Sequence, residues 1–225
     1  EIYIHDLNSY AVGMHNCLSV PFDKLLANGF NTRQTDVRPA QSVNTAFQLV
    51  AVIFQLQSLQ QFGGVSATHL DWTMIPYVRK SFYKHIKDGL MYMGEPSDYK
   101  VFHLHFKEIR ENADVGIENC DWSNYFTEEF CIPNEVYRYA IDMTEKEVYQ
   151  AVEGLYHNLN TLQSRSGNQL PFTSINYGTC TEPEGRMVTK ALLDVSIGGI
   201  GKLHKTSIFP CGIFQCMKGV NRKPG

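Results

Sequence analysis

The sequence lacks any apolar run close to the roughly 20 residues that a membrane-spanning helix requires. It also lacks an excess of positive charge, because 20 lysines and arginines face 23 aspartates and glutamates, for a net charge of −3. A chain so near neutrality offers no electrostatic case for binding nucleic acid or an acidic membrane surface. We therefore expect neither a membrane nor a nucleic acid among its partners.

The cysteines form no Cys-x-x-Cys pair and combine with no histidine at the spacing of a zinc finger, so no structural zinc site is expected in this chain. The pair His103 and His105 would share one face of a strand, but no further ligand has an obvious spacing, and we predict no metal there. The sequence also opens without a charged and apolar leader. Free thiols and a cytoplasmic location are therefore expected. The six cysteines stand at positions 17, 120, 131, 180, 211 and 216.

Two long helices are predicted in the first half of the chain. Over residues 40–62 apolar side chains recur at the i, i+3, i+4, i+7 spacing and extend over more than one side of the helix. A second helix should run from Asp71 or Thr73 to Met93, with Pro76 tolerated in its first turn. Since a short loop containing Gly63-Gly64 lies between them, we expect an antiparallel hairpin suited to a dimer interface.

The remaining segments alternate between strand-like and helical patterns. Thr144-Glu145-Lys146-Glu147 matches a capping box that would open a helix through Gln163. Strands alternating with long helices indicate an α/β fold with a parallel component. The other expected elements are a short helix over 21–29, a strand over 170–178, a helix over 184–197 and a strand over 207–214 that Pro210 disturbs.

The strand over residues 170–178 carries hydroxyl and amide side chains where an ordinary core strand carries Val or Leu. A buried hydroxyl or amide costs free energy unless it is hydrogen-bonded, so either protein groups or a polar ligand must satisfy these side chains. A half-solvated strand is the alternative interpretation. Because side chains alternate along a strand, Thr173 and Ser174 point to opposite faces and cannot line one pocket without a bulge.

Short motifs spread along nearly the whole chain resemble, in their order and spacing, the anaerobic (class III) ribonucleoside-triphosphate reductases, which are glycyl radical enzymes. The segment over residues 94–142 matches this family least well and is interpreted as a variable insertion. Besides the polar strand, the motifs are Ile4-His5-Asp6-Leu7, Asn16-Cys17-Leu18, Asn28-Gly29-Phe30, Gln61-Phe62-Gly63-Gly64, Pro76-Tyr77-Val78, Tyr83-Lys84-His85-Ile86, Glu184-Gly185-Arg186, Ile208-Phe209-Pro210 and Gly219-Val220-Asn221.

The resemblance implies a fold and a place within a larger protein. The family uses a ten-stranded α/β barrel made of two half-barrels, and residues 1–225 would form a single domain, the first half-barrel, with residues 40–93 as the interface helix pair. Both ends look cut, so we expect an internal piece of a longer reductase. The zinc site, the radical-cysteine loop and the glycyl radical loop would then lie outside this chain, which would hold no cofactor of its own.

The resemblance also implies roles for particular residues. Cys17 would be a redox-active thiol that donates hydrogen to a substrate radical, although a lone cysteine is more often an inert buried thiol. Asn16, Thr173, Ser174 and Asn176 are candidates to bind the ribose or phosphates of a ribonucleoside triphosphate. Two further groups could bind phosphate, namely the helix start near Glu184 and the polar loop over residues 163–169.

Regulation and partners follow from the same resemblance. Arg38 and Lys84 match the region that holds an ATP or dNTP effector at the interface of a homodimer, whereas a solvated face is the ordinary interpretation of the stripe Lys80, Lys84 and Lys87. A radical-SAM activating enzyme would be a further partner. The expected function is anaerobic reduction of ribonucleoside triphosphates to deoxyribonucleoside triphosphates. Two alternatives are a catalytically incomplete, dimeric nucleotide-binding module and a sister glycyl radical enzyme of the formate-lyase type.

Overall fold

The computed structural model describes residues 17–32, 34–60, 63–93, 132–163 and 169–223. The chain divides into two compact units, one formed by Glu1–Tyr77 with Val148–Gly225 and the other by Val78–Glu147. Asn16, His103, His105 and most of the predicted insertion lie outside the described residues.

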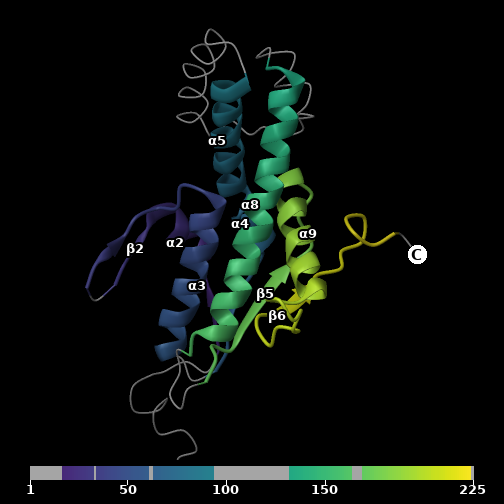
Figure 1. Ribbon diagram of the computed structural model, residues 1–225. Helices are drawn as coiled ribbons and strands as arrows, with labels where there is room; N and C mark the ends of the chain where they lie inside the picture. Colours follow the sequence, from purple (N-terminus) through teal and green to yellow (C-terminus); the bar gives the residue numbers. More distant parts are fainter. Residues whose placement is uncertain (1–16, 33, 61–62, 94–131, 164–168, 224–225) are drawn as a thin grey trace, which may run out of the picture. The chain divides into compact units, whose positions relative to one another are not determined.

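The first unit is built on a sheet of four parallel strands in the order β1-β4-β5-β6. The predicted α/β fold with a parallel component is therefore confirmed (Figure 1). Beside this sheet, β2 (Phe30–Asn31) pairs with β3 (Asp36–Val37) as a short antiparallel hairpin. The four parallel strands are β1 (Leu18–Val20), β4 (Val65–Ala67), β5 (Thr173–Tyr177) and β6 (Cys211–Phe214).

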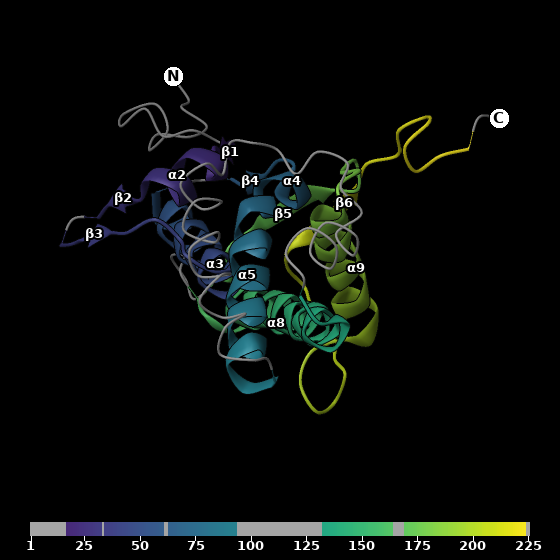
Figure 2. The ribbon, with the colours of Figure 1, turned by 90° about the horizontal axis from the view of Figure 1, so that it is seen from above.

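Helices cover one face of this sheet. α3 (Val43–Gln60), the part of α8 (Asn134–Thr161) from Val148 onward and α9 (Pro183–Gly198) lie on the same side of the strands (Figure 2). Tyr156 of α8 and Ser196 of α9 join two of them through a hydrogen bond of 2.8 Å between their hydroxyl oxygens. The core beneath these helices is apolar and close-packed, which holds the sheet against them.

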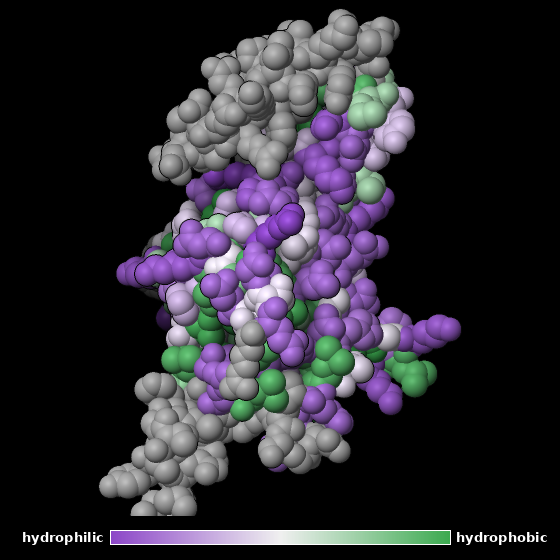
Figure 3. Space-filling model, turned by 90° about the vertical axis from the view of Figure 1, so that its left-hand side faces the viewer, coloured by the Kyte–Doolittle hydropathy of each residue, from purple (hydrophilic) through white to green (hydrophobic). Residues whose placement is uncertain are grey.

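Two short helices complete the first unit. α2 (Phe22–Asn28) follows β1, and Phe22 packs edge-on against Phe54 of α3 with ring centroids 5.0 Å apart. α4 (Leu70–Thr73) follows β4 directly, at the carboxyl end of that strand. Figure 3 views the side on which α2 and α3 lie in Figure 1 and shows separate hydrophobic areas within a mostly hydrophilic surface.

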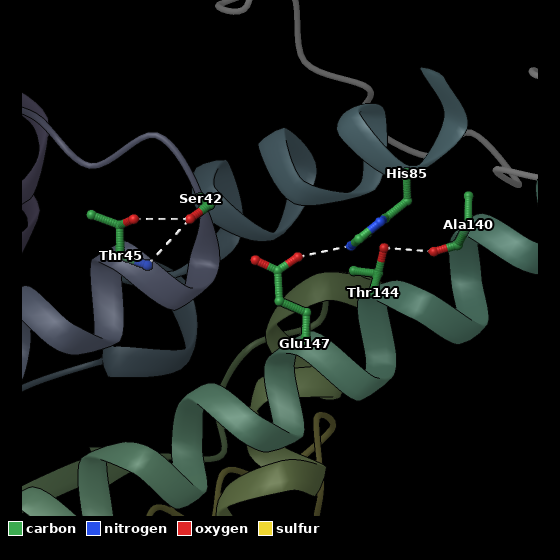
Figure 4. Close-up of polar contacts among 6 residues, drawn as sticks. All are labelled: Ser42, Thr45, His85, Ala140, Thr144 and Glu147. Atoms are coloured by element: carbon green, nitrogen blue, oxygen red, sulfur yellow. Dashed lines mark hydrogen bonds and ion pairs between the residues drawn. The ribbon is translucent and has the colours of Figure 1, made fainter. Parts of the chain in front are cut away.

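The second unit contains α5 (Ile75–Met93) from Val78 onward and the part of α8 up to Glu147. His85 and Glu147 lie 2.8 Å apart between Nε2 and Oε2 (Figure 4). Burial raises the pKa of Glu147, but the hydrogen bond and charge of His85, with contributions from Ser81 and Lys84, outweigh it and leave that pKa below 4.5. The apolar core of this unit comprises Phe82, Tyr83, Ile86, Leu90, Ile132, Val136 and Ala140.

The predicted capping box at Thr144 is wrong. α8 begins at Asn134, so Thr144 lies inside the helix, where its hydroxyl donates to the Ala140 carbonyl at 2.6 Å (Figure 4). A buried threonine within a helix commonly bonds the carbonyl four residues earlier, and the same Thr-x-x-Glu spacing therefore occurs away from helix starts. Glu147 correspondingly bonds His85 and does not reach back to the backbone of Thr144.

The predicted hairpin of two long helices is also wrong. Strand β4 and helix α4 separate α3 from α5, and β4 pairs in parallel with both β1 and β5. A strand of three residues, such as β4, is too short to show a periodic pattern, so the sequence alone predicts a loop there.

The other predicted elements agree with the structure to within a few residues. Pro76 lies in the first turn of α5, as expected, and Pro210 directly precedes β6. Among the described residues, no helix combines the length and the apolar character that crossing a membrane requires.

Candidate functional site

The face of the sheet turned away from the helices carries polar side chains. Burial alternates along β5, where Thr173, Ile175 and Tyr177 are buried and Ser174 and Asn176 are half-buried. Because successive side chains of a strand point to opposite faces, the first three lie on the helix-covered face and the last two on the open face. The structure thus places Ser174 and Asn176 together and separates Thr173 from them, as the alternation predicts.

A row of hydroxyl and thiol side chains crosses this open face. Ser19, Ser66, Ser174 and Cys211 occupy the same register position on the four parallel strands, and we call them the serine row. The hydroxyl oxygens of Ser19 and Ser66 are 2.8 Å apart and share a hydrogen bond. Paired residues of neighbouring strands point to the same side, so the row presents a continuous polar strip to a ligand. Sequence reasoning missed Ser19 and Ser66, because each lies in a strand of only three residues.

Cys17 directly precedes β1 and is exposed. It lies two residues before Ser19, so its thiol is available at the amino end of the strand that carries the first member of the serine row. The other described thiols differ from one another in their exposure to solvent. Cys211 and Cys216 are exposed, whereas burial raises the pKa of Cys180 to about 11, which makes that thiol unreactive near neutral pH.

The carboxyl end of the sheet is held by a buried carboxylate. Asp71, in α4, is fully buried, and its Oδ2 accepts backbone N–H bonds from Gly178 at 2.8 Å and Cys180 at 3.0 Å. Its Oδ1 accepts the N–H of Trp72 at 3.0 Å. The indole of Trp72 donates to Thr179 Oγ1 at 3.1 Å, which adds a second tie to the turn that follows β5.

An asparagine holds the same turn from the other side. The Asn221 amide donates to the carbonyls of Gly178 and Gln215, and its oxygen accepts the N–H of Met217 at 2.8 Å. Gly178 has a φ of 113°, a conformation that side-chain-bearing residues rarely adopt. A Cβ there would also lie 2.9 Å from the Phe214 ring, so this position requires glycine.

A cavity of about 410 Å³ opens beside this turn. Arg186 and Lys190 of α9 contribute positive charge to it, although Lys190 is paired with Asp194 at 2.6 Å. The arrangement suits an anionic group more than a cation. The lining also includes Asp194 itself, together with Gly178, Cys180, Thr189, Leu193, Phe214, Val220 and Asn221.

Two enclosed side-chain oxygens on β5 have no hydrogen-bond partner among the described residues. They are Oγ1 of Thr173 and Oδ1 of Asn176. The second belongs to Asn176, a half-buried residue of the open face whose Oδ1 is itself covered. The described residues contain no group of three or more His, Cys, Asp or Glu side chains that could hold a metal ion.

The two predicted effector residues belong to different compact units. Arg38 follows β3 in the first unit, and Lys84 lies in α5 in the second, and both are exposed. Each is therefore accessible to an anionic ligand within its own unit.

Comparison with known proteins identifies the family. A sequence profile described as "Anaerobic ribonucleoside-triphosphate reductase" matches residues 1–225. The chain belongs to this family. The resemblance read from the motifs is thereby confirmed.

Individual relatives carry the same name. The chain is 29% identical to the anaerobic ribonucleoside-triphosphate reductase of Haemophilus influenzae and 28% identical to that of Escherichia coli. It matches the enzyme of Enterobacteria phage T4 at 29% identity. These alignments cover 100%, 100% and 98% of this chain but 26%, 26% and 30% of the relatives, so the chain spans about a quarter of their length.

A solved structure of the anaerobic ribonucleotide reductase from Thermotoga maritima, in complex with dATP and CTP, is also similar. The match has a TM-score of 0.45 and 14% identity and covers 85% of this chain and 25% of the other.

Proposed function

We propose that this chain is a segment of an enzyme that reduces ribonucleoside triphosphates to deoxyribonucleoside triphosphates under anaerobic conditions. The observation that carries the proposal is the family match over residues 1–225. The open face of the parallel sheet supports it, since the serine row and Asn176 offer hydrogen-bonding groups to a ribose or a phosphate.

In this proposal the substrate lies on the open face. Ser174 and Asn176 bind it there, and Asn16 and Thr173 are the further candidates, of which Thr173 faces the helices. Arg186, at the cavity beside β5, is the proposed partner for phosphate because guanidinium pairs well with phosphate oxygens. The start of α9 contributes a favourable dipole for the same group.

Cys17 is proposed as a hydrogen donor. Replacing the ribose 2′-hydroxyl by hydrogen requires two electrons and two protons and releases water. The exposed thiol of Cys17 can donate a hydrogen atom to a substrate radical. Its sulfur would then form a disulfide with the cysteine of the radical-cysteine loop, so that the two thiols together supply two electrons and two protons. Formate or a small redox protein would return these two electrons and two protons to the disulfide. The glycyl radical of the longer protein would supply the initiating radical.

The family's zinc finds no fitting group among the described residues, as no cluster of three potential ligands occurs there. On the family resemblance, we propose that the zinc and the glycyl radical belong to parts of the longer protein outside this chain. A radical-SAM activating enzyme is the proposed partner that forms the radical, and the cytoplasm is the proposed location. The ten-stranded barrel, with residues 1–225 as the first half-barrel, belongs to this proposal as well.

A homodimer regulated by ATP or dNTP completes the proposal. Leu56 and Leu59 of α3 are 40% and 62% exposed, so this helix retains apolar surface that a second subunit could bury. Arg38 and Lys84 are the proposed effector contacts. Sedimentation of the full-length protein with and without dNTP tests this assembly, and a monomer at micromolar concentration with unchanged dNTP affinity would contradict it.

The decisive experiment replaces Cys17 in the full-length protein. Cys17→Ala should abolish dNTP formation while the glycyl radical signal in electron paramagnetic resonance persists, because the thiol acts after the radical forms. Cys216→Ala is the matched control, since this exposed thiol lies outside the serine row and should leave turnover unchanged. Full turnover by Cys17→Ala would remove Cys17 from the mechanism.

A further inference from the structure

Asp71 is a buried carboxylate that the proposed chemistry does not use. Its side chain is 0% exposed, and its oxygens accept three backbone N–H groups, those of Trp72, Gly178 and Cys180. Withdrawing a carboxylate from water is costly unless hydrogen bonds replace the lost solvation. Bonds that involve a charged acceptor are also shorter and stronger than neutral ones, so this contact fixes the donors in place.

Two of these donors come from the turn that follows β5. Gly178 is held on both sides of its own backbone, because its N–H bonds Asp71 and its carbonyl accepts the Asn221 amide. The side chain of Thr179 is tied to Trp72 as well. Three segments that are distant in sequence therefore meet at one turn, and Asp71 provides the charged contact among them.

The turn connects β5 to the first turn of α9. Asn176 precedes it on the open face of β5, and Arg186 follows it in α9 beside the cavity to which Gly178 and Cys180 also contribute. The direction in which the chain leaves β5 therefore determines where the first turn of α9, with Arg186, stands.

We propose that Asp71 is a positioning residue for nucleotide binding, which keeps the 178–180 turn in the conformation that places Arg186 for a phosphate of the ligand. This inference rests on the proposed function. Asp71 contacts no reacting group, because its oxygens are occupied by backbone N–H groups. If the ligand binds only molecules in which the turn is held, its apparent Kd equals the intrinsic Kd divided by the fraction of such molecules.

The test compares Asp71→Asn with wild type in the full-length protein. The asparagine is isosteric but presents an amide N–H₂ where one carboxylate oxygen accepted N–H bonds. If the held turn falls to about a tenth of the population, KM for the ribonucleoside triphosphate rises roughly tenfold while kcat at saturation stays within about threefold. Asp71→Glu keeps a carboxylate and should partly restore KM. Asp142→Asn makes the same chemical change on an exposed carboxylate of α8 and should match wild type.

A second readout is independent of activity. The backbone N–H of Cys180 is held by Asp71, and its thiol is buried, so release of the turn should speed alkylation of Cys180 as followed by mass spectrometry. Asp71→Asn with a lower Tm but wild-type KM would overturn the positioning role. If Asp71→Asn fails to fold, the same measurements are made on Asp71→Glu. Faster alkylation of Cys180 combined with a wild-type KM would also overturn the positioning role. Failure of the proposed function is distinguishable, since the wild-type protein would then form no dNTP at all.

Discussion

Gly185 lies in the first turn of α9 and is buried against the turn that follows β5. A Cβ at this position would lie 2.2 Å from Cys180 Sγ, 2.7 Å from Cys180 Cβ and 3.0 Å from the Asp71 carbonyl oxygen. None of these atoms ends a long flexible side chain. Gly185→Ala therefore forces the backbone of α9 or of the turn to move.

The magnitude follows from two opposing effects. Overpacking a close-packed site costs about 1–3 kcal/mol, and the 2.2 Å contact puts this site at the upper end of that range. Replacing glycine by alanine in a helix returns at most about 1 kcal/mol. We therefore expect Gly185→Ala to lower the free energy of unfolding by about 2 kcal/mol, measured by urea denaturation followed by circular dichroism.

Gly154 provides the matched control. It lies within α8 in the same compact unit, and a Cβ there would meet no atom within 4 Å. Gly154→Ala should accordingly raise stability by about 0.5–1 kcal/mol. Adding Cys180→Ala to Gly185→Ala removes the sulfur contact and should recover at least about 1 kcal/mol as a coupling energy. Equal stability of the two glycine variants, or no coupling with Cys180, would refute the steric argument.

Two further predictions concern side-chain contacts. The pKa of Glu147 is lowered from 4.5 in the folded protein, so the contribution of its contact with His85 to stability is present above pH 4.5 and is lost as the pH falls through the folded-state pKa. Glu147→Gln should therefore flatten the dependence of Tm on pH below 4.5. An unchanged dependence would exclude the contact between His85 and Glu147 as the source of that pH dependence. Asn160→Ala should cost about 2 kcal/mol, because the amide bonds the Phe209 carbonyl and the N–H groups of Ile208 and Phe209, whereas Asn158→Ala should cost much less.

The sequence predicted those elements whose patterns extend over several residues. The alternation of β5 needs five residues to show, and from it the sequence correctly predicts that Ser174 and Thr173 lie on opposite faces of the sheet. β4 has only three residues and therefore shows no periodic pattern, so the sequence predicts a loop between the long helices, and the hairpin prediction is wrong for this reason. For the same reason, the sequence does not predict that Ser66 belongs to a strand or that the serine row exists.

The contacts of Asp71 could not have been predicted from local sequence. Its partners Gly178 and Cys180 are 107 and 109 positions away, and no pattern within a window of that helix marks the carboxylate as buried. The Thr144 box failed for a related reason, because a side chain inside a helix and one at its start share the same spacing to a following glutamate. Such choices are decided by tertiary packing, which local spacing does not contain.

Three asparagines show how satisfaction of polar groups separates structural residues from ligand-facing ones. Asn160 and Asn221 each use both the nitrogen and the oxygen of the side-chain amide to bond backbone groups of loops, so these amides are engaged in holding the fold. Asn176 differs, because its enclosed Oδ1 has no partner among the described residues. Leaving such an acceptor unpaired costs about 1–3 kcal/mol, which a ligand that donates an O–H or N–H can recover. A ribose hydroxyl is a donor of this kind, and we therefore infer that Asn176, of these three, is the asparagine that binds substrate.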